Sequence, residues 1–199
     1  MILEEGLLYH IYNQGNNRQQ IFFNRDNYLF FLKKINLHLL PHVDVLAWCL
    51  MPNHFHLMVY VRELIIRGAT SSRTPNSQQD LNKSIGIMLA SYTRAINIQE
   101  NRTGSLFRDK TKAECITKID EGITPSFNNS YAGTRINTHI TEQAYQKICF
   151  DYIHQNPVTA GLTDLAEDWE FSSYRDYSGL RNGKLINKER AKEFGLFSF

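Results

Sequence analysis

The stretch that decides the fold runs from Asp44 to Val61 and reads DVLAWCL, MPN, HFHLMVYV. Its two outer parts are rich in branched and aromatic side chains, which is typical of strands. The Met-Pro-Asn triplet at 51–53 separates them with turn-forming residues. Because the break is so short, the sequence predicts an antiparallel hairpin of strands 44–50 and 54–61.

The second strand of this hairpin has two chemically different faces, because alternate side chains of a strand point in opposite directions. The apolar face belongs against helices and comprises Phe55, Leu57, Val59 and Val61. The other face carries His54 and His56, about 7 Å apart along the strand. Neutral imidazoles are good ligands for a divalent cation. The alternative is that two histidines simply lie on a half-exposed sheet face.

The flanking sequence predicts the remaining elements from hydrophobic spacing. We expect strands over 7–13 and within 104–116, and helices over 27–40, 81–98 and 142–155, the last ended by Asn156-Pro157. The order strand, helix, strand, strand, helix, strand, helix predicts an α+β fold. It favours a ferredoxin-like (RRM-like) antiparallel sheet with helices on one face.

Length and composition set the class of protein. The chain has 199 residues and a formal net charge of +2, which fits a single domain over 1–199 and by itself indicates no partner. Its three cysteines form no CxxC pair, which argues against zinc fingers and disulfide scaffolds and favours the cytoplasm. No apolar run approaches the roughly 18 residues of a membrane span. We therefore expect no membrane partner.

Three stretches differ from the rest in composition. Residues 67–80 are polar and turn-rich and read as a flexible loop, and 121–141 read as a polar insertion. Residues 164–199 form a C-terminal extension with several aromatic side chains.

A second motif, FDYIHQNPVTAGL, lies at 150–162. Tyr152 and Asn156 are four residues apart, so they share one helix face. A phenol is a poor nucleophile at its normal pKa of about 10, but a cation that binds a target phosphate helps it attack. The alternative is an aromatic core residue followed by an Asn-Pro helix stop. His154 points away from Tyr152 around the helix, and we expect it to be structural or a DNA contact. His10 and Tyr12, on the first strand, could border the metal face, but His10 is better explained as a structural histidine.

The ordered combination of these motifs resembles the HUH single-strand DNA transposases, in particular the repeat-associated tyrosine transposases (RAYT). The resemblance runs from about Leu7 to Tyr177. It includes the AWCLMPNHFHLMV hairpin, GSLFR at 104–108, the helix of Tyr152, and W-x-x-S-S-Y at 169–174. It implies a ferredoxin-like sheet with the tyrosine helix lying over the active-site face.

Carried over residue by residue, the resemblance implies that Tyr152 is the nucleophile and that His54, His56 and Asn156 bind a divalent metal, Mg²⁺ or Mn²⁺. The implied reaction cleaves and rejoins single-stranded or hairpin DNA through a 5′-phosphotyrosine intermediate, in a monomer or a homodimer. The chain departs from the family at Thr159, where a basic residue often follows NPV, and in the length of 121–141.

The DNA needs a basic surface, and residues 82–118 carry seven basic side chains against three acidic ones. As a cluster they are a plausible track for phosphates, although a single one is as well explained by a solvated face. The residues expected to bind DNA are Arg94, Arg102, Arg108, Lys110 and Lys112.

Three other functions compete with this interpretation. A barrel metal hydrolase with an HxH pair needs about 250 residues and further ligands. A non-catalytic RNA or DNA binder places aromatic side chains where this chain has His54 and His56. The third is a catalytically silent or domesticated single-stranded nucleic-acid-binding protein of the same fold.

Overall fold

The computed structural model describes residues 1–67, 78–117 and 141–197. The longer helices alternate with strands as the sequence predicts. The strands are β1 (Leu8–Gln14), β2 (Val43–Met51), β3 (His54–Val61), β4 (Ile65–Arg67), β5 (Gln78–Asp80) and β6 (Lys112–Cys115). The helices are η1 (Asn16–Arg18), α1 (Arg25–His38), α2 (Leu81–Gln99), α3 (Glu142–Thr159), η2 (Ala166–Asp168), α4 (Tyr174–Tyr177) and α5 (Lys188–Glu193).

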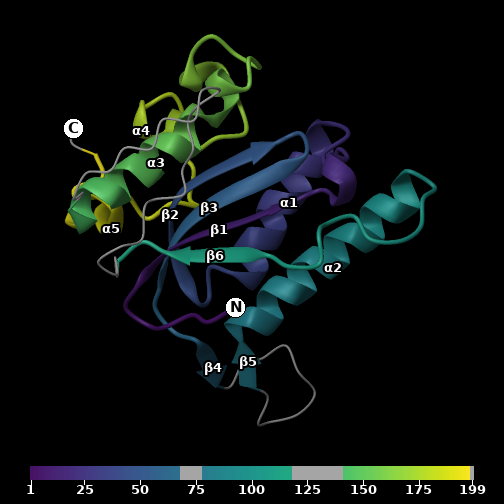
Figure 1. Ribbon diagram of the computed structural model, residues 1–199, viewed down its shortest axis with the longest axis horizontal. Coiled ribbons are helices and arrows are strands. Elements are labelled where there is room, and N and C mark those ends of the chain that lie inside the picture. The colour runs from purple at the N-terminus through teal and green to yellow at the C-terminus, as the bar shows by residue number, and fades with distance from the viewer. Residues whose placement is uncertain (68–77, 118–140, 198–199) are drawn as a thin grey trace.

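Four strands form one antiparallel sheet in the order β2-β3-β1-β6 (Figure 1). This is the strand order of a ferredoxin-like fold, so the predicted class, α+β, and the predicted hairpin of β2 and β3 are confirmed. β1 lies in the middle of the sheet, where it pairs with both β3 and β6. Two short strands, β4 and β5, form a separate pair before α2.

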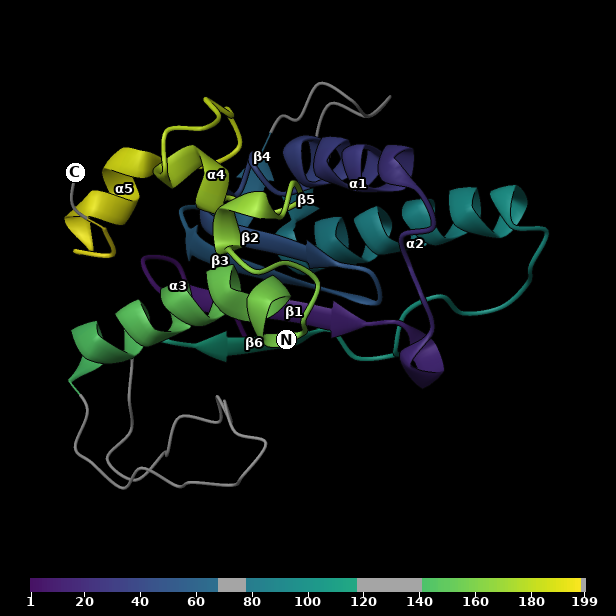
Figure 2. The ribbon, with the colours of Figure 1, turned by 90° about the horizontal axis from the view of Figure 1, so that it is seen from above.

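The sheet is covered on both faces by different helices (Figure 2). α1 and α2 pack on one face, where Phe55, Leu57, Val59 and Val61 join a large apolar core. α3 lies on the opposite face over a second core that contains Met58, Cys149 and Ile153. The two faces of β3 therefore divide as its alternation predicts. The histidines point toward α3, which lies over the face where the tyrosine helix is expected.

A register shift between Val45 and Ala47 interrupts the pairing of β2 with β3. Val45 packs into the core under α1 and α2, whereas both Leu46 and Ala47 belong to the core under α3. A bulge of this kind lets one strand change its inside–outside phase without leaving the sheet. It brings Trp48 back toward the α1 and α2 side.

α3 corrects one prediction, because it does not end at Asn156-Pro157 but continues through Pro157 to Thr159. The end is set by Gly161, which has φ +67. The amide of Gly161 donates to the Val158 carbonyl, and the amide of Leu162 donates to the Pro157 carbonyl, each at 2.9 Å. This pair of bonds is the Schellman ending of a helix. Proline lacks only one backbone donor, and the glycine signal that follows it decides where the helix stops.

The C-terminal extension runs along the outer edge of β2. The Leu50 amide donates to the Phe171 carbonyl, and the Ser173 amide donates to the Trp48 carbonyl, both at 2.9 Å. The Trp169 indole donates to the Leu50 carbonyl at 3.0 Å. Open strand edges invite unwanted pairing, so this segment both satisfies the edge and ties the extension to the sheet.

Two sequence predictions concern segments that the structure describes only in part. Of the predicted loop 67–80, residues 68–77 lie outside the described residues, and its two ends belong to β4 and β5. The predicted insertion 121–141 lies outside them except for Thr141, which caps α3. Among the described helices, none has the length and apolar character needed to cross a membrane.

Candidate metal and tyrosine site

The two histidines of the HxH pair lie side by side on β3. Their ring centroids are 4.9 Å apart, and the rings are nearly perpendicular. In the sheet, His56 pairs with Tyr12 of β1 and with Cys49 of β2. Being on an interior strand, it is 5% exposed, while His54 at the strand's start is half-buried. The strand therefore fixes both imidazoles on one rigid surface.

Each histidine uses its Nδ1 atom within the protein. The Nδ1 of His54 lies 2.6 Å from Oδ1 of Asn53, and the Nδ1 of His56 lies 2.8 Å from Nε2 of His10. The Nε2 of His56 is buried and has no hydrogen-bond partner among the described residues. A buried polar atom without a hydrogen-bond partner is rare, and it usually binds a ligand, an ion or a water molecule.

Burial also fixes the charge of these rings. It lowers the pKa of His54, against a smaller opposing effect of a hydrogen bond with Asn156. Burial, together with the neighbouring His10 and His54, lowers the pKa of His56 well below its usual value. Both rings are therefore neutral at neutral pH, which is the form that donates a lone pair to a metal.

α3 brings Tyr152 to the same place. The Tyr152 ring meets His56 edge to face with centroids 5.4 Å apart, and it meets His10 in the same manner at 6.1 Å. Burial raises the pKa of Tyr152, against a smaller opposing hydrogen bond from Asn156. The phenol therefore holds its proton at neutral pH.

Asn156 completes the group from the next turn of α3. Its amide nitrogen donates to the Tyr152 carbonyl at 2.8 Å. Its side chain also lies close enough to the side chains of His54 and Tyr152 to affect the pKa of each. Since helical geometry continues through Asn156, this residue stays on the Tyr152 face, and it is not merely a stop signal.

His154 holds α3 in this position. This is the structural role, one of the two roles that the sequence predicts for it. It is 2% exposed, and its Nε2 lies 2.7 Å from the hydroxyl of Ser173. The same hydroxyl accepts a hydrogen bond from the Trp48 amide at 2.8 Å. The chain His154–Ser173–Trp48 therefore connects α3, the C-terminal extension and β2.

The residues brought together fit a divalent cation. Within 1–67, 78–117 and 141–197, no group of three or more His, Cys, Asp and Glu side chains is placed to hold a metal ion. Among these described residues the candidate third donor is of another type, the Asn156 amide oxygen, which suits a hard cation such as Mg²⁺. Two imidazoles, one with a partnerless buried Nε2, and one amide oxygen form such a donor set.

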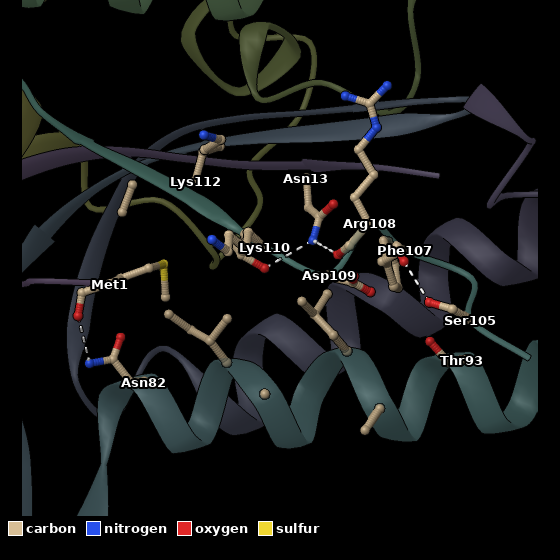
Figure 3. A pocket seen from close by; sticks show the side chains of 16 residues that line it. Met1, Asn13, Asn82, Thr93, Ser105, Phe107, Arg108, Asp109, Lys110 and Lys112 are labelled. Carbon is tan, nitrogen blue, oxygen red and sulfur yellow. Dashed lines mark hydrogen bonds between the residues drawn. The ribbon is translucent and has the colours of Figure 1, made fainter. Parts of the chain in front are cut away.

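The five predicted DNA-binding residues line two neighbouring grooves that share Ala90 and Thr93 of α2. The larger groove, of about 750 Å³, runs between α2 and the segment 105–113. Figure 3 shows that the side chains of Arg108 and Lys112, on that segment, extend away from α2. Arg108, Lys110 and Lys112 all line this larger groove. Arg94 and Arg102 line the smaller groove, of about 430 Å³.

The five residues therefore do not form one uniform patch. Lys112 pairs with Tyr12, which pairs with His56, so Lys112 belongs to the face of the sheet that carries the histidines. Arg102 is half-buried and donates to Oε1 of Gln19 at 3.0 Å and to the Ser105 carbonyl at 3.3 Å. Its guanidinium thereby braces the turn after α2.

Comparison with known proteins gives one informative match. No family model matches the sequence, and no curated protein matches it. A solved structure described as a REP-associated tyrosine transposase bound to a REP hairpin matches with a TM-score of 0.55, over 94% of this chain and 92% of that one. The chain has the fold of a tyrosine transposase. Sequence identity to that transposase is 17%, so the likeness establishes the architecture alone.

One residue beside the site is given only a structural role by the sequence. His10 reads as a structural histidine, yet it contacts His56 directly. Its partner stands 46 positions away in the chain. The signal that points to it is the alternation of β1, which places His10 and Tyr12 on one face, but the pairing register with β3 is needed to bring that face against His56.

Proposed function

We propose that this protein is a metal-dependent transposase or endonuclease that cleaves and rejoins single-stranded DNA through a 5′-phosphotyrosine intermediate. The observation that carries the proposal is the position of Tyr152, whose ring packs against His56 while Asn156 contacts both Tyr152 and His54. A nucleophile, two imidazoles and an amide thus meet on one sheet face. The fold shared with the REP-associated tyrosine transposase supports it.

A divalent metal would be held by His54, His56 and Asn156, and when bound it supplies Lewis-acid polarisation of the scissile phosphate. The chain itself supplies the nucleophile. The Tyr152 oxygen forms a bond to phosphorus as the bond from phosphorus to the 3′ oxygen breaks. The phenol loses its proton, and the departing 3′ oxygen takes up a proton to become a hydroxyl. The number of phosphoester bonds is unchanged, so a later 3′-hydroxyl reverses the step without ATP.

Burial of Tyr152 determines when the phenol must give up its proton. Because burial raises the pKa of Tyr152, the phenol must lose its proton as it reacts. The edge-on packing against His56 and His10 holds the ring while this happens. A nucleophile that is already fixed beside the phosphate site lowers the entropic part of the reaction barrier.

The proposed DNA path crosses the same sheet face. Arg108 and Lys112 extend away from α2, and Lys112 lies beside Tyr12 on the histidine face. Exposed cations at this edge suit the backbone of a strand that leads to Tyr152. The REP hairpin of the matched transposase structure makes a stem-loop with single-stranded flanks the natural first substrate.

The test uses a DNA stem-loop with randomised single-stranded flanks and a fluorophore on its 3′ end. A 5′-phosphotyrosine link keeps the 3′ fragment on the protein, so a labelled band should appear at the protein's position on a denaturing gel in Mn²⁺. The same oligonucleotide labelled at its 5′ end should give a shorter free fragment and no labelled protein. Binding of the stem-loop without either product would favour the silent nucleic-acid-binding protein.

A further inference from the structure

A histidine that the proposed reaction does not use lies in contact with the site. His10 stands in the middle of β1, is 2% exposed, and has its Nε2 atom 2.8 Å from Nδ1 of His56. The two rings stack with centroids 5.0 Å apart and planes at 21°. Both side chains are buried, so bulk solvent does not compete for this hydrogen bond.

The geometry points to His10 as a positioning residue that holds His56 in the tautomer with the proton on Nδ1, so that the Nε2 lone pair of His56 is the one offered to a metal. A hydrogen bond between two imidazole nitrogens holds one proton, and two arrangements exist. If His56 donates from Nδ1, its buried Nε2 has a lone pair. If His10 donates instead, the Nε2 of His56 carries a hydrogen and cannot be a ligand.

The neighbouring histidine shows why His56 needs such a partner. The Nδ1 of His54 faces Oδ1 of Asn53 at 2.6 Å, and an amide oxygen only accepts. That contact by itself fixes the tautomer of His54 with its proton on Nδ1. An imidazole partner, in contrast, is able to donate or accept, so the tautomer of His56 depends on that of His10. Partners of this kind, outside the ligand set, orient metal-binding histidines and tune their affinity.

The His10 ring is itself held in place from two sides. Tyr12 stacks on it with centroids 4.7 Å apart, and the Tyr12 hydroxyl is anchored to the Glu114 carboxylate at 2.6 Å. Tyr152 packs edge-on against His10 at 6.1 Å, with planes at 80°. Because the ring cannot turn freely between these neighbours, its Nε2 stays directed at His56. The nucleophile and the metal ligand therefore share one support.

This inference deepens the proposed function, since the metal is part of that proposal, but the first test needs neither DNA nor metal. The metal-free protein is labelled with ¹⁵N-histidine, and long-range ¹H–¹⁵N spectra are recorded at pH 7.5. His56 is assigned by the loss of its signals in His56→Gln. We expect the wild-type His56 signals of an imidazole protonated at Nδ1. His10→Phe keeps a stacked ring but has no hydrogen-bond acceptor. In this variant we expect the His56 imidazole to be no longer protonated at Nδ1 alone.

The second test measures Mn²⁺ binding by the DNA-free protein, using the paramagnetic signal of the free ion. His10→Phe should bind Mn²⁺ about 10- to 100-fold more weakly than wild type. His10→Gln has an amide oxygen that accepts from His56, and it should recover part of the affinity. His42→Phe is the matched control, because His42 is fully buried and hydrogen-bonded to Glu63 and Ser84, at the opposite end of the β2–β3 hairpin. It should leave Mn²⁺ binding unchanged.

A wild-type His56 protonated at Nε2 would overturn the inference, and so would unchanged Mn²⁺ affinity in a folded His10→Phe protein. The outcomes separate from those of the proposed function. If the tautomer and the affinity change are as expected but no DNA adduct forms, the proposed reaction fails and the role of His10 stands. If adducts form while His10→Phe has wild-type tautomer and affinity, only the role of His10 fails.

Discussion

The phenol ring of Tyr152 and the imidazole of His56 meet at 5.4 Å between centroids and at 80° between planes, although they come from α3 and β3. This contact joins the proposed nucleophile to the proposed metal ligand within one chain. The two residues stand about 100 positions apart in the sequence, and the packing of α3 on the sheet brings them together.

Replacement of Tyr152 by Phe removes only the phenolic oxygen. The ring still packs against His56 and His10, so we expect the thermal midpoint and the affinity for the stem-loop to stay near wild type. The covalent adduct should disappear. A Tyr152→Phe protein that still forms a labelled adduct would assign the attack to another residue. Tyr145→Phe, about two turns earlier in α3, is the matched control and should keep the adduct.

Replacement of Asn156 by Ala tests the third ligand. The variant lacks the amide oxygen proposed as the third metal ligand, beside His54 and Tyr152, so the Mn²⁺ concentration for half-maximal cleavage should rise, and excess Mn²⁺ should partly restore the rate. Asn156→Asp keeps a hard oxygen donor and should be affected less. Gln155→Ala, at the exposed neighbouring position, should behave as wild type. Unchanged metal dependence together with a lower thermal midpoint in Asn156→Ala would assign the residue a structural role only.

Neutralisation of Arg108 and Lys112 tests the DNA path. Arg108→Gln and Lys112→Gln should each weaken single-strand binding, and the slope of log affinity against log salt should fall by about 0.7 for each phosphate that is no longer bound. Lys33→Gln, on α1 beneath the opposite sheet face, is the control. Unaltered affinity and slope in the double variant would place the DNA elsewhere. Binding of fully paired duplex at equal strength would also contradict the single-strand path.

Arg102 should respond differently from Arg108. Its guanidinium donates to Gln19 and to the Ser105 carbonyl, so Arg102→Gln should lower the free energy of unfolding by about 1 kcal/mol. Urea denaturation measures this difference. If Arg102→Gln keeps full stability but binds DNA more weakly, the sequence-based assignment of Arg102 to DNA is the correct one.

His154 gives the folded protein a predictable dependence on pH. Burial lowers its pKa to about 3, against an ordinary value of 6.5 in the unfolded chain. As the pH falls from about 6.5 toward 3, the unfolded chain takes up a proton that the folded one does not. Folding stability therefore decreases on acidification by roughly 1.4 kcal/mol per pH unit from this group, and its contribution is constant above about pH 6.5.

The His154 contribution is isolated by comparing urea denaturation of wild type and His154→Phe at pH 7, 5 and 4 in chelator. The variant keeps an aromatic ring beside Phe150 but lacks the bond to Ser173. It should be less stable at pH 7 and should be destabilised less by acidification. Parallel pH profiles for the two proteins would show that His154 titrates normally in the folded state.

Sequence patterns predict this structure well where the pattern is local. The alternation of HFHLMVYV assigns both faces of β3, and the tyrosine-to-asparagine spacing places Tyr152 and Asn156 on one face of α3. Prediction fails where the local structure depends on a segment that is distant in the sequence. The bulge at Leu46 depends on how β2 meets two cores, and His10 reaches His56 only through the pairing register. The predicted end of α3 is wrong because Pro157 is a weaker stop signal here than Gly161, whose left-handed backbone closes the helix.

The central claim, that Tyr152 attacks DNA, is tested most directly by digesting the covalent adduct with trypsin and nuclease and sequencing the modified peptide by mass spectrometry. We expect the peptide containing Tyr152 to carry a nucleotide through a 5′-phosphate on the phenol oxygen. A nucleotide on any other residue, or a cleaved stem-loop with no modified peptide, would contradict the claim.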